Sequence, residues 1–426
     1  MLKVCTKEEW EKSSPRKDIG SWEEQEKAVK TIIADIKNRG DEALRELALK
    51  FDGCHLESLV VEEQEIQEAR QKVGSDFINA LHKAAENIEI FHRRQSRNSF
   101  ISTEESGIIL GQMVIPLEKV GAYVPGGTAS YPSSVLMNVI PAKIAGVKEI
   151  YMCTPPGKDG KINPYTLTAA AKLGVEKIFK MGGAQAVAAF AYGTGTVPVV
   201  DKIVGPGNIY VTLAKKLVYG DVDIDMLAGP SELLIIADST ADPRFIAADI
   251  MSQAEHDPLA ANFIVTPDPE LPGRVLNSLQ EQLPQMSRRD IIQKSLEEHS
   301  AIIVVKNLEE AFRVSNDIAP EHLEVIIEDP LASLPWIKNA GSVFLGGFTP
   351  EPLGDYYAGP NHVLPTGGAA RFSSGLNVDD FIKKTTILYY PKQALKEAAE
   401  DVILLAEVEG LDAHANTVKV RMKNIE

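Results

Sequence analysis

The stretch LLIIA (233–237) carries the signal that decides the fold. Its consecutive apolar residues lack the alternation of a half-exposed strand, so it predicts a strand buried on both faces. Six further short apolar runs are separated by helical patterns and bounded by Gly and Pro: EIYMC (149–153), KIFKM (177–181), DKIVG (201–205), NFIVT (262–266), AIIVV (301–305) and SVFLG (342–346). Strands of this kind, alternating with helices, predict parallel sheets covered on both faces.

The number of these strands sets the expected domain organisation. Seven of them, with an earlier one near 59–61, are more than one compact lobe needs. We therefore predict an α/β fold of two doubly wound, Rossmann-like lobes, with a helical N-terminal segment and a helical C-terminal tail. The expected boundaries are 1–19 for the N-terminal segment, 20–122 with 231–376 for one lobe, 123–230 for the other lobe, and 377–426 for the tail.

The composition of the chain indicates which binding partners and which cellular compartment to expect. The 426 residues carry 44 basic and 60 acidic groups, a net charge of −16 that argues against a nucleic-acid surface or an anionic membrane partner. The three cysteines lie far apart, without a metal or disulfide spacing. The charged N-terminus MLKVCTKEEWEK is unlike a signal peptide, and no apolar run approaches the ~18 residues of a membrane helix. We expect a cytoplasmic protein.

Three glycine-rich stretches follow or flank the expected strands: YVPGG (123–127), MGGAQA (181–186) and GPGN (205–208). Glycine lets backbone amides approach a phosphate closely, and loops at the carboxyl ends of strands bind ligands in α/β folds. None of the three is a complete G-x-G-x-x-G, and each alone is also typical of an ordinary turn. Their occurrence in successive β–α units favours a nucleotide site.

The stretch MSQAEHDP (251–258) concentrates polar groups at the end of an expected helix. Gln253 and His256 are three residues apart and therefore share one helix face. An imidazole near a helix C-terminus also interacts well with the helix dipole, which is a purely structural explanation. A metal or catalytic site requires matching groups elsewhere in the chain.

Three more histidines stand in dense polar clusters: His322 in APEHLE (319–324), His362 in GDYYAGPNHVLPT (354–366) beside Asp355, and His414 in EVEGLDAH (407–414). Their nitrogen and oxygen donors suit zinc, or manganese or cobalt in its place. The residue types alone leave the choice of metal open, because glutamine is an uncommon ligand and no compact metal signature is present.

The motifs SQAEHDP, APEHLE, AGPSE (228–232), GPGN and GDYYAGPNHVLPT closely resemble those of the histidinol dehydrogenase family, in the same order. The resemblance extends from about Val120 to His414. It implies a two-step, NAD-dependent oxidation of L-histidinol to L-histidine through L-histidinal, with a bound zinc ion. It also implies a homodimer in which the tails complete the partner's active site.

The resemblance further implies a role for each site residue. The lobe formed by 20–122 and 231–376 would carry the metal and catalytic residues, and the lobe 123–230 would bind NAD. Glu321 and His322 would form the acid–base pair. The metal ligands would be Gln253, His256, Asp355 and His414, which with His322, Ser231, His362 and Glu409 would also contact the substrate, while Tyr123, Gln185 and Asn208 would contact NAD.

The two oxidation steps explain why a histidine and a glutamate are needed, and they leave an alternative route for the aldehyde step open. A histidine with an ordinary pKa near ~6.5 suits the base of the alcohol step, and Glu321 would accept a proton from the water that hydrates the aldehyde. A cysteine thiohemiacetal is the other route for aldehydes, and Cys153 is the one candidate for it; we favour the water route because no cysteine lies between 228 and 414. The rival functions are a metal-dependent hydrolase and a two-lobed small-molecule binding protein.

Overall fold

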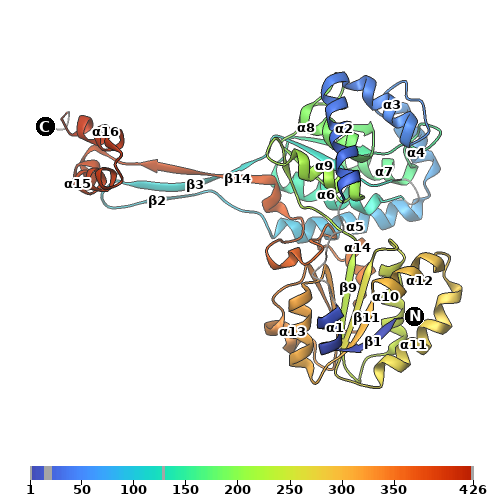
Figure 1. Ribbon diagram of the computed structural model, residues 1–426. Coiled ribbons are helices and arrows are strands. Elements are labelled where there is room, and N and C mark those ends of the chain that lie inside the picture. The colour runs from blue at the N-terminus through green and yellow to red at the C-terminus, as the bar shows by residue number, and fades with distance from the viewer. Residues whose placement is uncertain (1, 14–21, 127–129, 424–426) are drawn as a thin grey trace. The chain divides into compact units, whose positions relative to one another are not determined.

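The computed structural model describes residues 2–13, 22–126 and 130–423. Residue contacts divide the chain into two units. The first unit comprises Met1–Gln95 and Leu117–Phe381, and the second comprises Ser96–Pro116 and Ile382–Glu426. The predicted fold class is confirmed, because the first unit contains two parallel sheets with helices on both faces (Figure 1).

One lobe of the first unit is built on a parallel sheet with the strand order β6-β5-β4-β7-β8. The strands are β4 (Lys119–Tyr123), β5 (Glu149–Thr154), β6 (Lys177–Lys180), β7 (Lys202–Val204) and β8 (Asp223–Ile224). The connecting helices are α6 (Pro132–Ala145), α7 (Pro164–Leu173), α8 (Gly183–Tyr192) and α9 (Ile209–Val218).

The other lobe is built on a parallel sheet with the order β1-β11-β10-β9-β12-β13. Its strands are β1 (Lys3–Thr6), β9 (Glu232–Ala237), β10 (Ala261–Thr266), β11 (Ala301–Val304), β12 (His322–Ile326) and β13 (Ser342–Leu345). Its helices are α1 (Lys7–Ser13), α10 (Pro243–Ala254), α11 (Leu271–Gln282), α12 (Arg289–Glu298), α13 (Leu308–Ile318) and α14 (Glu351–Tyr356). Apart from β1, the strand order repeats that of the first lobe.

Strand β9 shows why the apolar runs predict this fold. Leu233 and Ile235 belong to the core that includes α10, α11 and α12, whereas Leu234 and Ile236 belong to the core that includes α13. Since successive side chains of a strand point to opposite faces, both faces of β9 must be apolar. The seven predicted strands are all present, and β1 adds a strand to the N-terminal segment that we expected to be helical.

The helices before residue 95 pack on the five-stranded lobe. Helix α2 (Glu23–Arg39) contacts α8 and α9, α4 (Glu63–Lys72) contacts α7, and α5 (Ser75–Arg93) contacts α6. Helix α3 (Asp41–Phe51) contributes Leu44 to the core that contains Phe179 and Phe190. We expected residues 20–122 to group with 231–376. The helices before residue 95 instead pack on the five-stranded sheet, because their apolar faces cover the helices of that lobe.

Residues 59–61, where the sequence predicts a strand, lie at the edge of the same sheet. Val60 forms an isolated antiparallel bridge with Phe179 of β6. The Val61 N–H donates to the Ile178 carbonyl at 2.9 Å, and the Lys180 N–H donates to Leu59 at 2.8 Å. The remaining short helices of the first unit are η1 (Leu283–Gln285), η2 (Leu331–Trp336), η3 (Ala369–Arg371) and η4 (Val378–Phe381).

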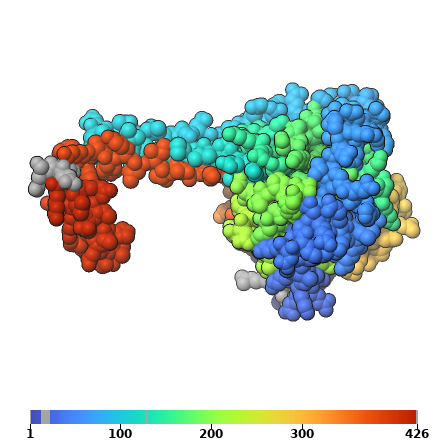
Figure 2. All heavy atoms as spheres, turned by 90° about the horizontal axis from the view of Figure 1, so that it is seen from above, coloured from blue at the N-terminus to red at the C-terminus, as the bar shows by residue number. Residues whose placement is uncertain are grey.

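The second unit contains an antiparallel sheet of order β14-β3-β2, formed by β2 (Phe100–Thr103), β3 (Ile109–Pro116) and β14 (Ile382–Tyr389). In Figure 2, β14 in orange-red lies along β2 and β3 in cyan. Helix α15 (Lys392–Val408) packs against α16 (Asp412–Lys423). The tail expected at 377–426 therefore contains a strand before its two helices.

Across residues 2–13, 22–126 and 130–423, no helix combines the length and the apolar character that a membrane span requires.

Candidate active site

The candidate site lies at the amino ends of two neighbouring strands of the six-stranded sheet. Glu232 is the first residue of β9, and His322 is the first residue of β12, with Glu321 directly before it. Ligands of doubly wound folds usually bind at the carboxyl ends of strands. Here α10 runs back from the carboxyl end of β9 and brings Gln253 and His256 to the amino edge, so that the site forms on the opposite side of the sheet.

His322 is buried, and its ring is held through Nδ1. Its Nδ1 lies 3.2 Å from the Glu232 carbonyl oxygen and 3.7 Å from Oε2 of Glu321. Its Nε2 lies 3.6 Å from Oδ1 of Asp355 and makes no hydrogen bond within the described residues. With Nδ1–H donating to the Glu232 carbonyl, Nε2 is the ring atom that remains for a ligand.

Carboxylates dominate the electrostatics around this imidazole. Burial disfavours its charged form, but Glu351, Glu321 and Asp355 together raise the pKa of His322 to about 10. Burial raises the pKa of Glu351 to about 8, whereas for Asp355 the interaction with His322 outweighs burial and lowers the pKa. In the protein without bound cations, these carboxylates favour the charged form of the His322 imidazole.

Glu351, which the sequence analysis did not select, belongs to this cluster. Donor atoms of His322, Glu351 and Asp355 all lie within 4.8 Å of one another. Glu351 and Asp355 are four residues apart on α14, a spacing that puts them on one helix face and that the sequence contains. That spacing becomes informative only once Asp355 is known to face a buried site.

Gln253 is completely buried and its amide is oriented by its neighbours. In the orientation that satisfies both ends, its NH₂ group donates to the two Glu351 oxygens at 2.7 and 3.1 Å. Its oxygen then accepts the Glu232 N–H at 3.0 Å. The same N–H lies 2.9 Å from Oε2 of Glu321, so the Glu232 backbone links the amide to the acid of the expected acid–base pair.

His256 follows the end of α10 and keeps an exposed surface. Its N–H donates to the Gln253 carbonyl at 3.2 Å. Partial loss of hydration lowers the pKa of His256, while the charge of Asp355 opposes this shift. The structure thus brings together Gln253, His256, Glu321, His322 and Asp355 at one edge of the sheet.

His362 connects this site with the five-stranded lobe. Its Nδ1 lies 2.9 Å from the Asp355 carbonyl oxygen, and its Nε2 lies 3.2 Å from the Ser134 hydroxyl in the first turn of α6. Ser231 is half-buried directly before β9, and its carbonyl accepts the Ala261 N–H at 3.0 Å. Both residues therefore flank the cluster around His322.

Glu409 and His414 belong to the second unit. Glu409 is the C-cap residue of α15, and His414 lies in the first turn of α16. Both side chains are exposed. The backbone N–H of His414 donates to the Leu411 carbonyl at 3.0 Å.

The three residues expected to contact NAD lie at the carboxyl edge of the five-stranded sheet, as the glycine-rich stretches predict. Tyr123 ends β4, and its buried hydroxyl accepts the Gly183 N–H at 3.1 Å. Gln185 is buried in the first turn of α8. Asn208 caps α9, because its side-chain oxygen accepts the N–H groups of Tyr210 and Val211. Gly127, the last residue of YVPGG, lies outside the described residues.

The donor set at the amino edge fits a divalent cation. It combines imidazole nitrogens with carboxylate and amide oxygens, the ligands that zinc and its first-row neighbours accept. The buried Nε2 of His322, which faces Asp355 of this donor set at 3.6 Å, lacks a hydrogen-bond partner among the described residues, and a buried polar atom of this kind calls for a bound group beside the same donors. The residues present therefore suit the metal that the sequence motifs imply.

Fold and site together define a two-lobed α/β enzyme with a buried imidazole–carboxylate centre. The chain belongs to the histidinol dehydrogenase family, whose family model matches residues 16–422. It is 57% identical over 397 residues to a histidinol dehydrogenase of Clostridium acetobutylicum, which covers 93% of this chain and 92% of that protein. This assignment confirms the resemblance of the sequence motifs.

Full-length comparisons agree with this assignment. A histidinol dehydrogenase of Carboxydothermus hydrogenoformans is 52% identical over 427 residues, covering 100% of both chains. The crystal structure of a histidinol dehydrogenase from Elizabethkingia anophelis matches with a TM-score of 0.93 and 40% identity, over 100% of this chain and 98% of that chain. The described architecture is therefore that of the family.

Proposed function

We propose that this protein catalyses the zinc-dependent, NAD-linked, four-electron oxidation of L-histidinol to L-histidine through L-histidinal, the last steps of histidine biosynthesis. The observation that carries the proposal is the buried cluster of His322, Asp355 and Gln253 in a chain of this family. The relatives and the solved structure above are named histidinol dehydrogenases over nearly their full lengths.

Gln253, His256, Asp355 and His414 would hold the zinc ion. A bound cation supplies a fixed anchor for the imidazole and amino nitrogens of the substrate and adds positive charge beside the carboxylates. Ser231, His362 and Glu409 would contact the same substrate. Support comes from the donor chemistry at the amino edge and from the proximity of His362 to Asp355.

Tyr123, Gln185 and Asn208 would contact NAD, which accepts the hydride in each oxidation. These residues lie at or after the carboxyl ends of three strands of one sheet, β4, β6 and β7, where doubly wound folds bind dinucleotides. The glycines of their loops allow close approach of the backbone. The hydrogen bond between Tyr123 and Gly183 ties two of these loops together.

His322 would take the hydroxyl proton of the alcohol through Nε2, because Nδ1 faces the Glu232 carbonyl. For this role the imidazole must be neutral, which requires positive charge nearby to offset Glu351, Glu321 and Asp355. Glu321 would accept a proton from the water that adds to the aldehyde carbonyl and forms the hydrate for the second oxidation. Its Oε2 is held by the Glu232 N–H, which fixes the carboxylate beside His322.

The protein would act as a homodimer in which His414 and Glu409 complete the partner's site. Support comes from the second unit itself, where α15 exposes Leu405 and Val408 by 65% and 78% of their surface. Exposed apolar patches mark interaction sites in soluble proteins.

We place the reaction in the cytoplasm, since Cys5, Cys54 and Cys153 are all free, as expected in a reducing compartment.

The test is to mix purified protein with L-histidinol and NAD and to follow reduced nicotinamide by absorbance. We expect reduction of NAD that is lost on chelation and restored by zinc. A hydrolase or a binding protein would form no reduced nicotinamide. Turnover that survives complete removal of metal would contradict the zinc requirement and leave the dehydrogenase activity standing.

A further inference from the structure

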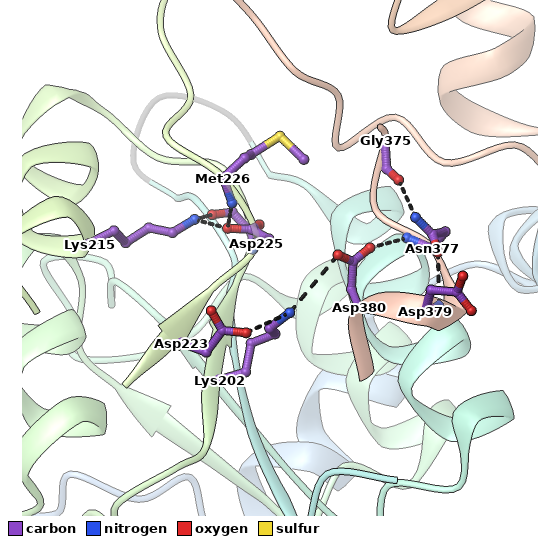
Figure 3. A network of polar contacts seen from close by, with 10 residues as sticks. Lys202, Lys215, Asp223, Asp225, Met226, Gly375, Asn377, Asp379 and Asp380 are labelled. Carbon is purple, nitrogen blue, oxygen red and sulfur yellow. Dashed lines mark hydrogen bonds and ion pairs between the residues drawn. The ribbon is translucent and has the colours of Figure 1, made fainter. Parts of the chain in front are cut away.

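A buried ion pair joins helix α9 to the end of strand β8. Lys215 on α9 pairs with Asp225, and the two side chains are 3% and 1% exposed (Figure 3). Removing both charges from water is costly, so a buried pair is weak evidence of a gain in stability. The contacts of the two groups indicate what the pair does instead.

Both members of the pair bind the same residue of the GPGN loop. Oδ2 of Asp225 accepts the Gly205 N–H at 2.7 Å, and Nζ of Lys215 donates to the Gly205 carbonyl at 3.0 Å. Oδ1 of Asp225 also accepts the Met226 N–H at 2.6 Å. The backbone groups of Gly205 are thus held from both sides by two charged groups that neutralise each other.

Gly205 occupies a position at which the path of the chain is restricted. Its φ is +110°, and a Cβ atom there would overlap the Tyr123 carbonyl oxygen. The loop therefore passes directly against the end of β4, and three residues later it reaches Asn208, the cap of α9. Fixing Gly205 fixes the geometry between Tyr123 and Asn208.

We propose that Lys215 and Asp225 are positioning residues for NAD, which hold the 205–208 loop in its binding conformation before the dinucleotide arrives. The inference rests on the proposed function, because Tyr123 and Asn208 are the NAD contacts proposed above. A preformed loop avoids the ordering cost that binding would otherwise incur. The charges of the pair strengthen both hydrogen bonds to Gly205 relative to neutral partners.

A second ion pair in the same sheet provides a matched control. Lys202 on β7 lies 2.9 Å from Asp223 and 4.0 Å from Asp380 (Figure 3), and its side chain is 8% exposed. Its ion-pair partners are on β8 and η4, and no hydrogen bond of Lys202 to Gly205 is present among the described residues. The two lysines are both buried, although Asp223 is 50% exposed, so if burial of a paired lysine in this lobe mattered only for folding, both lysines would behave alike.

The experiment compares Lys215→Met and Asp225→Asn with Lys202→Met. For each protein we would measure the dissociation constant of NAD by calorimetry, the KM values of NAD and histidinol, and the melting temperature. We expect the dissociation constant and the KM of NAD to rise about tenfold or more in Lys215→Met and Asp225→Asn, since small displacements of a binding group are costly. The KM of histidinol should stay within about twofold of the wild-type value. Lys202→Met should keep the wild-type constants for NAD.

Unchanged NAD affinity in folded Lys215→Met and Asp225→Asn proteins would overturn the positioning role alone. Absence of any NAD binding to the wild-type protein would overturn the proposed function and this role with it. Hydrogen exchange of the wild-type protein tests the inference even if a variant fails to fold. The Gly205 amide should exchange slowly without NAD, and fast exchange that slows only on NAD addition would contradict a preformed loop.

Discussion

Nε2 of His322 lies 3.6 Å from Oδ1 of Asp355, and no hydrogen bond occupies this nitrogen within the described residues. The imidazole expected to move protons therefore faces a carboxylate expected to hold the metal. Since Nδ1 is turned toward the Glu232 carbonyl, Nε2 on the Asp355 side is the ring nitrogen that remains for a substrate. The groups proposed for proton transfer and for metal binding therefore lie side by side, and each can be removed separately by mutation.

Replacing His256 by asparagine should remove a metal donor and leave the fold intact, because the side chain keeps an exposed surface. We expect metal content to fall below one ion per subunit and turnover to fall more than about 100-fold, since even outer contacts of metal sites are worth 10–100-fold. Elemental analysis and rate measurements on the same preparation test this. His55→Asn, at an exposed histidine outside the site, is the control, and a His256→Asn protein with full metal and full turnover would show that the ligand assignment is wrong.

The roles of Glu321 and His322 can be separated because histidinol and histidinal can be supplied independently. Glu321→Gln keeps an oxygen for the Glu232 N–H but lacks the base, so it should impair histidinal oxidation more than the alcohol step. His322→Asn should slow the alcohol step. Losing one positioned acid or base typically costs ~10²–10⁴-fold. Equal losses of both half-reactions in both variants would refute this division of roles.

The sequence predicts the strands well because a doubly buried strand must be apolar along its whole length, as β9 illustrates with Leu234 and Ile235. It does not predict which sheet an amphipathic helix covers, since an apolar face on α2 or α5 would pack equally well on either lobe. Glu351 was missed for a related reason. Its sequence neighbourhood is that of an ordinary acid in a helix, and only the tertiary fold buries it beside His322 and Gln253.

Mixing two inactive variants tests whether the sites are shared between subunits. Under the shared-site proposal, a heterodimer of His256→Asn and His414→Asn chains has one site with both defects and one with neither. Activity should therefore return in part when the two proteins are unfolded and refolded together. Each variant refolded alone is the control, and no recovery despite verified exchange of subunits would mean that each chain builds its own site.

Asp52 should make stability depend on pH. Its Oδ2 is buried without a hydrogen bond in the part of the chain that is described, and burial raises the pKa of Asp52 to about 6. The folded protein binds this proton more tightly than the unfolded chain, so the stabilisation is complete below about pH 4 and is lost as the pH rises through about 6.

Asp52→Asn should accordingly melt at a higher temperature than the wild type at neutral pH, and this difference should shrink as the pH falls toward about 4. Asp290→Asn is the control, because the Asp290 side chain is 94% exposed. A melting difference for Asp52→Asn that is the same at both pH values would show that the carboxyl group does not titrate in this range.

The most direct test of the four-electron assignment is the stoichiometry of the complete reaction. With limiting L-histidinol and excess NAD, the zinc-loaded wild-type protein should form two molecules of reduced nicotinamide for each histidinol consumed, with L-histidine as the product and no accumulation of free histidinal. One molecule of reduced nicotinamide per histidinol, with histidinal released into solution, would contradict the account.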